Sequence, residues 1–129
     1  MVTDASALVE VLLRMPAATA VEAQLFDSGR TLHAPHLLDV EVAQVIRRHA
    51  ASGRIAERRG SAALEVLTGM PIQRYPHDTL LARIWELRGN LSAYDAAYVA
   101  LAEALDAPLL TRDQRLAGAA RRYARVEVI

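Results

Sequence analysis

Short apolar segments alternate with longer amphipathic segments along the chain, and this alternation restricts the possible folds more than any other feature. The short segments have the length and composition of buried strands, while the longer ones repeat apolar residues at helical spacing. Chains with this alternation build a mainly parallel sheet covered by helices. We therefore expect an α/β protein with three α/β/α layers and a central, mainly parallel sheet of four or five strands.

The expected elements follow one another closely, separated by turn residues such as Ser28-Gly29 and Gly53. Gly60 is expected to interrupt or weaken its helix. The expected strands are 2–3, 31–34, 72–75, 108–110 and 125–129. The expected helices are 6–14, 18–27, 37–52, 55–68, 78–88, 93–105 and 113–122.

The composition excludes several classes of enzyme. All fifteen basic residues are arginine, so the chain lacks the lysine that a P-loop or a Schiff-base enzyme requires. There is no cysteine, which excludes disulfides, a thiol nucleophile and cysteine-ligated zinc. With 129 residues, the chain is expected to form one domain over residues 1–129.

The sequence shows no membrane or export signal. No apolar run reaches the roughly 18 residues of a membrane span, and the N-terminus has no basic segment typical of a signal peptide. We expect a cytoplasmic protein with no membrane segment.

Four acidic residues lie where a solvated surface acid is not expected. Most of the other acids, Glu10 among them, fit exposed helix faces. Asp4 directly follows an expected strand and Asp113 lies just past another, whereas Glu41 and Asp95 lie on apolar stripes of their helices. Each also has an ordinary explanation, as a helix cap or a first-turn acid, or, for Glu41, as a buried acid with a polar partner.

Taken together, these four acids indicate a metal site. Carboxyl ends of parallel strands meet at one edge of a sheet, so the four carboxylates would be gathered there. Two such charges about 4 Å apart repel by about 4 kcal/mol at an effective dielectric near 20. Either several carboxylates are protonated, or divalent cations neutralise them. Oxygen ligands favour Mg²⁺ or Mn²⁺, which suit phosphodiester hydrolysis by a metal-activated water.

Four segments resemble the motifs of PIN-domain ribonucleases, in the family's order and over essentially the whole chain. The first is 2–8, a strand that leads into Asp-x-Ser, and the second is 33–42, which contains the glutamate of the family. The third is 91–103 and the fourth is 109–113, with Thr-x-Asp. Within the family, the chain is most similar to VapC-like toxins of type II toxin–antitoxin modules.

The resemblance implies a single PIN-like domain and assigns the catalytic, metal-binding acids to Asp4, Glu41, Asp95 and Asp113. Ser6 and Thr111 match the hydroxyl residues of the first and fourth motifs and would hold carboxylates in place. The implied activity is Mg²⁺- or Mn²⁺-dependent cleavage of RNA that leaves a 5′-phosphate and a 3′-hydroxyl. The implied partners are a second copy of the chain, as a homodimer, and a small inhibitory antitoxin.

Several residues keep two interpretations. Asp39 is either a first-turn acid or an additional outer ligand. Arg112 and Arg115, beside Asp113, either contact RNA phosphate or form ordinary surface ion pairs. Arg47, Arg54 and Arg58 could share one RNA-binding face if their two helices stay coaxial. Tyr94 either stacks on a base or packs, and Tyr98 is interpreted as a core aromatic. Trp85 is expected to pack in the core or at an interface.

Two alternative functions remain open. The chain could be a PIN-like interaction module without chemistry, or a nuclease specialised for DNA structures or RNA processing. A zinc pair at His33 and His36 is disfavoured because Pro35 lies between them at an expected strand-to-helix turn. A serine hydrolase is disfavoured because the chain has no Gly-x-Ser-x-Gly segment.

Overall fold

The structure, a computed structural model, describes residues 1–27 and 29–129, and its centre is a five-stranded parallel sheet. Across the sheet the strands follow the order β3-β2-β1-β4-β5, which places the first strand at the centre. The strands are β1 (Val2–Thr3), β2 (Leu32–Pro35), β3 (Ile72–Tyr75), β4 (Leu109–Thr111) and β5 (Val126–Val128). The predicted α/β class and parallel sheet are confirmed.

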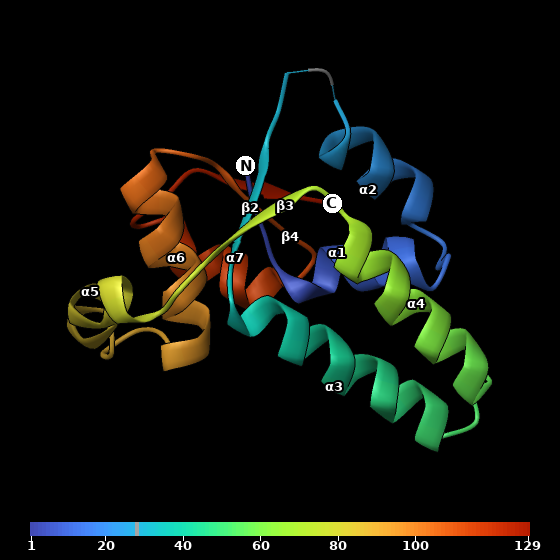
Figure 1. Cartoon of the computed structure of the whole chain (residues 1–129). Helices are drawn as coiled ribbons and strands as arrows, with labels where there is room; N and C mark the ends of the chain where they lie inside the picture. The colour runs from blue at the N-terminus through green and yellow to red at the C-terminus, as the bar shows by residue number, and fades with distance from the viewer. Residues whose placement is uncertain (28) are drawn as a thin grey trace.

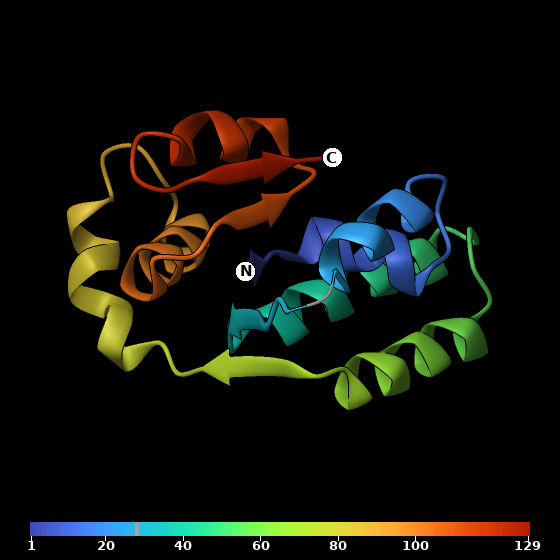
Figure 2. The same ribbon diagram turned by 90° about the horizontal axis from the view of Figure 1, so that it is seen from above.

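Helices cover both faces of this sheet. They are α1 (Ala5–Leu12), α2 (Ala18–Leu25), α3 (Leu37–Ala51), α4 (Glu57–Gly69), α5 (Leu81–Glu86), α6 (Ala93–Leu105) and α7 (Gln114–Ala120), with a 3₁₀ turn, η1 (Asp78–Leu80). Seen from above, α1 to α4 lie on one side of the strands, and α5 and α6 lie on the other (Figure 2).

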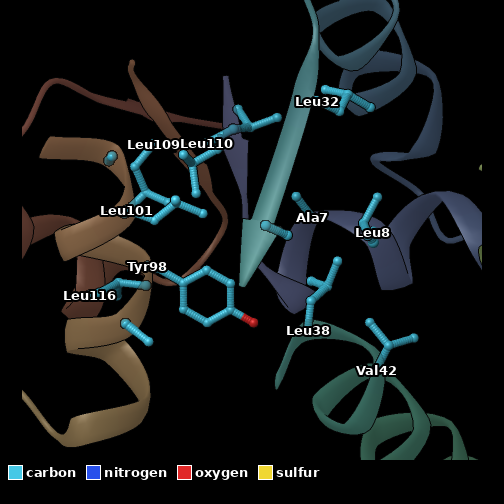
Figure 3. Close-up of a cluster of buried hydrophobic side chains, with 14 of the residues drawn as sticks. Ala7, Leu8, Leu32, Leu38, Val42, Tyr98, Leu101, Leu109, Leu110 and Leu116 are labelled. Atoms are coloured by element: carbon cyan, nitrogen blue, oxygen red, sulfur yellow. The ribbon is translucent and has the colours of Figure 1, made fainter. Parts of the chain in front are cut away.

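The core consists of the strands and the helices packed directly on them. Val2, Leu109 and Leu110 are completely buried, which explains why their strands have no alternating polar residues. Helix α6 is buried along its whole centre because it packs across β1, β2 and β4. The Tyr98 ring reaches from α6 into this core, toward α1 and α3 (Figure 3).

The carboxyl ends of the central strands all open toward one edge of the sheet. Helices α1, α3 and α7 begin there, each directly after one of these strands, and α6 begins at the same edge (Figure 1). Strands β1 and β4 are neighbours, with Thr3 opposite Leu110, so residues that follow these two strands lie side by side. This edge collects the acids that the sequence singled out.

Two possibilities that the sequence left open for α3 and α4 are not realised. Helix α4 is not interrupted at Gly60. The missing side chain instead lets α4 pack closely on α3, since an added Cβ would lie 3.0 Å from the Ile46 Cγ2 atom. Helices α3 and α4 are also not coaxial. The chain turns back between them at Gly53, which has a φ of +76° that glycine tolerates, so Arg47 and Arg58 do not continue one helical face (Figure 1).

Two further observations concern the bounds of the elements and of the described residues. The expected helix over 78–88 is divided into η1 and α5, and the turn expected at Ser28-Gly29 lies partly outside the described residues. Across residues 1–27 and 29–129, none of the helices combines the length and apolar character needed to cross a bilayer.

Candidate active site

One cavity at the carboxyl edge of the sheet brings the four singled-out acids together. Its volume is about 150 Å³. Besides Ala5, Ser6, Tyr98 and Leu116, its lining consists of Asp4, Glu41, Asp95 and Asp113. A larger surface hollow of about 570 Å³ lies near the C-terminal end of α6, but none of the four singled-out acids lines it. The smaller cavity is therefore the candidate site.

Asp4 is the most deeply buried of these acids, with 5% of its surface exposed. It is the N-cap of α1, and its Oδ1 atom accepts hydrogen bonds from the Ala7 amide at 3.1 Å and the Ser6 hydroxyl at 2.7 Å. Its Oδ2 atom accepts a hydrogen bond from the Thr111 hydroxyl. Asp4 therefore caps α1 and at the same time lines the cavity, and its role as a metal ligand stays a prediction.

Ser6 and Thr111 connect the first and fourth motifs. The Ser6 hydroxyl accepts a hydrogen bond from the Arg112 amide at 2.9 Å, and the Thr111 hydroxyl accepts one from the Asp113 amide at 2.9 Å. Each hydroxyl thus donates to Asp4 while it accepts from the backbone that follows β4. This arrangement fixes the Asp4 carboxylate relative to Asp113.

Glu41 projects from the buried side of α3 and accepts a hydrogen bond from the Tyr98 hydroxyl at 2.6 Å. The Tyr98 ring is almost completely buried, as expected for a packing residue. Its contact with Glu41 was not anticipated from the sequence. The available signal was that a buried tyrosine hydroxyl requires a polar partner.

Asp95 and Asp113 lie at the start of α6 and α7. Asp95 is in the first turn of α6, which Ser92 caps by accepting a hydrogen bond from the Asp95 amide at 3.2 Å. Asp113 caps α7 through hydrogen bonds from the Arg115 and Leu116 amides. The Arg115 guanidinium joins the two acids, with its Nη2 atom 2.8 Å from Asp95 Oδ2 and 3.2 Å from Asp113 Oδ2.

Burial among like charges favours the neutral forms of two of the acids. Desolvation raises the pKa of Asp4 above its usual value, and nearby Asp113 adds to this effect, although the three hydrogen bonds to Asp4 oppose it. Desolvation also raises the pKa of Glu41, together with the charges of Asp95 and Asp4, while the Tyr98 hydroxyl lowers it. The cavity thus has an excess of negative charge that a cation would relieve.

The donor chemistry fits the divalent cation that the resemblance implies, since carboxylate oxygens are the ligands that Mg²⁺ and Mn²⁺ prefer. Within the described part of the chain, however, no three histidine, aspartate or glutamate side chains converge closely enough to hold one ion. An ion with three protein ligands would therefore require the cavity acids to rearrange, whereas one or two carboxylates plus water also suffice for Mg²⁺. Arg115 already bridges two of these acids.

Other predicted residues lie outside the cavity. Asp39 forms a two-pronged ion pair with Arg74, at 2.8 and 3.0 Å, which favours the first-turn interpretation over a role as outer ligand. Tyr94 and Trp85 are each 67% exposed, so Trp85 is not a core residue, and its role at an interface stays a prediction. Arg47, Arg54 and Arg58 take part in no ion pair among residues 1–27 and 29–129.

The expectation that Glu10 is a solvated surface acid is wrong. Glu10 is 9% exposed, lies 3.1 Å from the Arg112 Nε atom and accepts a hydrogen bond from the Ala17 amide. Arg112 also donates to the backbone oxygen of Ile129. These contacts use part of the Arg112 guanidinium, and the role of Arg112 as an RNA contact stays a prediction.

The sequence itself matches the model of a known family. The PIN domain is the family whose sequence pattern matches residues 1–122. The chain therefore belongs to the PIN-domain family.

Within this family, the chain is similar to VapC ribonucleases. It is 46% identical to Ribonuclease VapC1 of Mycobacterium tuberculosis over 92% of this chain and 89% of that protein. It is 39% identical to Ribonuclease VapC12 of the same species, over 99% of this chain and 98% of that protein. A crystal structure of VapBC2 from Rickettsia felis, bound to a DNA fragment from its promoter, shares the fold with a TM-score of 0.69 at 13% identity; the match covers 98% of this chain and 96% of that chain.

Proposed function

We propose that this chain is an endoribonuclease that acts as the toxin of a toxin–antitoxin pair. The observation that carries the proposal is the convergence of four carboxylates on one cavity, in a chain 46% identical to a VapC ribonuclease. The substrate is RNA, and cleavage leaves a 5′-phosphate and a 3′-hydroxyl. A cognate antitoxin holds the enzyme inactive, and the working form is a cytoplasmic homodimer.

Asp4, Glu41, Asp95 and Asp113 would hold one or two Mg²⁺ or Mn²⁺ ions. Such a cation, when bound, lowers the pKa of a water molecule and stabilises the negative charge that builds up on the phosphate. The chain contributes orientation: Thr111 and Ser6 fix Asp4, Tyr98 fixes Glu41, and the start of α7 fixes one oxygen of Asp113. Carboxylate oxygens would make the site selective for a hard cation, which they would hold at this edge of the sheet.

The test is cleavage of a structured RNA by purified protein in Mg²⁺ or Mn²⁺, with and without EDTA. Asp95→Asn preserves the shape of the side chain and removes its charge. We expect EDTA to abolish cleavage and Asp95→Asn to reduce it by at least about a hundredfold. Even the mutation of residues that only hydrogen-bond to metal ligands typically lowers activity by about tenfold to a hundredfold.

The control is Glu65→Gln, which removes an exposed carboxylate on α4, away from the cavity. It is expected to cleave like the wild type. Equal cleavage by Asp95→Asn and the wild type would contradict the proposal. No binding of millimolar Mn²⁺ in calorimetry would favour an inert interaction module, and a preference for DNA over RNA would favour a structure-selective nuclease.

A further inference from the structure

Arg115 places a single positive charge between two acids of the candidate site. One nitrogen, Nη2, lies 2.8 Å from an oxygen of Asp95 on α6 and 3.2 Å from an oxygen of Asp113, which caps α7. These acids come from two different elements, and the guanidinium is what joins them. A divalent cation bridging two carboxylates would take a similar position.

The Arg115 side chain approaches this position from solvent. It is 68% exposed, whereas the Asp95 side chain is 15% exposed and that of Asp113 is 37% exposed. Within residues 1–27 and 29–129, its guanidinium makes no hydrogen bond other than those to these two acids. The side chain can therefore leave the acids without disturbing the core.

The neighbouring Arg112 is placed differently, although it directly precedes Asp113. Its guanidinium turns to Glu10 at 3.1 Å and to the backbone oxygen of Ile129 at 3.1 Å. Of these two neighbouring arginines, Arg115 pairs with the cavity acids and Arg112 does not, so closeness in sequence to Asp113 does not by itself explain the pairing.

We propose that Arg115 is a built-in counter-ion of the acidic cavity, which occupies the position of a divalent cation and moves away when the cation binds. The identity of that cation rests on the proposed function. In the cation-free protein, Arg115 neutralises part of the charge of Asp95 and Asp113. The incoming cation must replace these two ion pairs, so Arg115 lowers the affinity of the site for that cation.

The test measures Mn²⁺ binding by calorimetry and melting temperature in EDTA for the wild type and Arg115→Gln. Removing two exposed ion pairs that compete with the ion is expected to tighten Mn²⁺ binding about three- to tenfold. In EDTA, the same variant is expected to melt roughly 2–4 °C below the wild type because the two acids lose their counter-ion.

Arg125→Gln is the matched control. Arg125 is 70% exposed, compared with 68% for Arg115, and it pairs with Asp106 beyond the opposite end of α6. The control removes the same charge and is expected to keep the Mn²⁺ affinity of the wild type. Arg115→Lys retains the charge without the planar fork and is expected to give an intermediate affinity.

The possible outcomes separate this inference from the proposed function. Unchanged or weaker Mn²⁺ binding by Arg115→Gln, relative to Arg125→Gln, would overturn the inference while leaving metal binding intact. If no variant binds Mn²⁺, the metal-dependent function fails, and the melting temperatures in EDTA decide the inference. A lower value for Arg115→Gln than for Arg125→Gln then supports the counter-ion, and equal values overturn it.

Discussion

At the scale of single residues, Glu41 links the chemistry of the cavity to the stability of the protein. Burial and the nearby charges of Asp95 and Asp4 raise its pKa in the folded state. Between the unfolded and folded pKa values, the folded protein binds more protons than the unfolded chain. The stability that Glu41 contributes is therefore fully present below its unfolded pKa and is lost as the pH rises through its folded pKa.

We expect Glu41→Gln to stabilise the cation-free protein while it removes activity. The glutamine oxygen can still accept the hydrogen bond from Tyr98, and the unfavourable charge disappears. In EDTA at pH 8, the melting temperature is expected to rise by roughly 2–4 °C, measured by circular dichroism. The gain should shrink as the pH is lowered toward 4, where Glu41 in the wild type becomes neutral as well.

Glu65→Gln provides the reference for this measurement, because it removes an exposed glutamate from α4. Exposed substitutions of this kind change the free energy of unfolding by about 0.5 kcal/mol or less. A gain for Glu41→Gln that is independent of pH, or a loss of stability, would show that the charge of Glu41 is not destabilising.

At the scale of elements, helix starts carry the site. Helices α1 and α7 begin at Asp4 and Asp113, and α6 begins just before Asp95. Free amides at these helix starts donate to the capping acids, and the helix dipole favours negative charge there. The same positions therefore stabilise helices and present carboxylates to the cavity.

Two glycines inside helices should respond differently to alanine. Nothing lies within 4 Å of a Cβ added at Gly118 in α7, whereas one added at Gly60 in α4 would lie 3.0 Å from Ile46 Cγ2. We expect Gly118→Ala to raise the free energy of unfolding by about 0.5–1 kcal/mol through helix propensity. The free energy of unfolding of Gly60→Ala is expected to be about 1 kcal/mol lower than that of Gly118→Ala, because Ile46 is confined by the core.

Urea unfolding of both variants checks this difference. Because each change replaces glycine with alanine inside a helix, propensity largely cancels in the comparison, and the difference reports the contact between α3 and α4. Equal free energies of unfolding for the two variants would show that Ile46 moves freely enough to accept the extra methyl group.

At the scale of the whole molecule, a neutral net charge hides an uneven distribution. Setting aside the four cavity acids and Arg115, which pairs with two of them, leaves eleven acidic residues against fourteen arginines. The surface outside the cavity therefore carries an excess of positive charge. Part of it lies at the turn between α3 and α4, where Arg47, Arg54 and Arg58 remain outside the ion pairs seen in residues 1–27 and 29–129.

This distribution predicts that RNA binding depends strongly on salt. For about four phosphate contacts, affinity for single-stranded RNA should fall roughly fiftyfold between 50 and 200 mM NaCl. Fluorescence anisotropy with Asp95→Asn in Mg²⁺ measures binding without cleavage. An affinity independent of salt would contradict a role for the arginine excess, and a variant with Arg47, Arg54 and Arg58 changed to glutamine should show a flatter dependence.

The sequence alone determined the architecture and the candidate acids. Strand length, helical spacing and turn residues are local signals, and they predicted the parallel sheet and nearly all of its elements. Asp4 and Asp113 stood out because they directly follow strands, and Glu41 and Asp95 because they lie on apolar stripes. In each case, residues a few positions away in the chain carried the information.

The tertiary structure decided which side chains meet across the fold. Glu10 pairs with Arg112, Tyr98 binds Glu41, and Arg115 reaches Asp95, although the two members of each pair lie far apart in the chain. No local pattern marks such a pair, because its energy depends on the distance between elements and on the loss of solvent around both groups. The sequence supplied the charges of the cavity, and the packing of α3, α6 and α7 determined which of them neutralise one another.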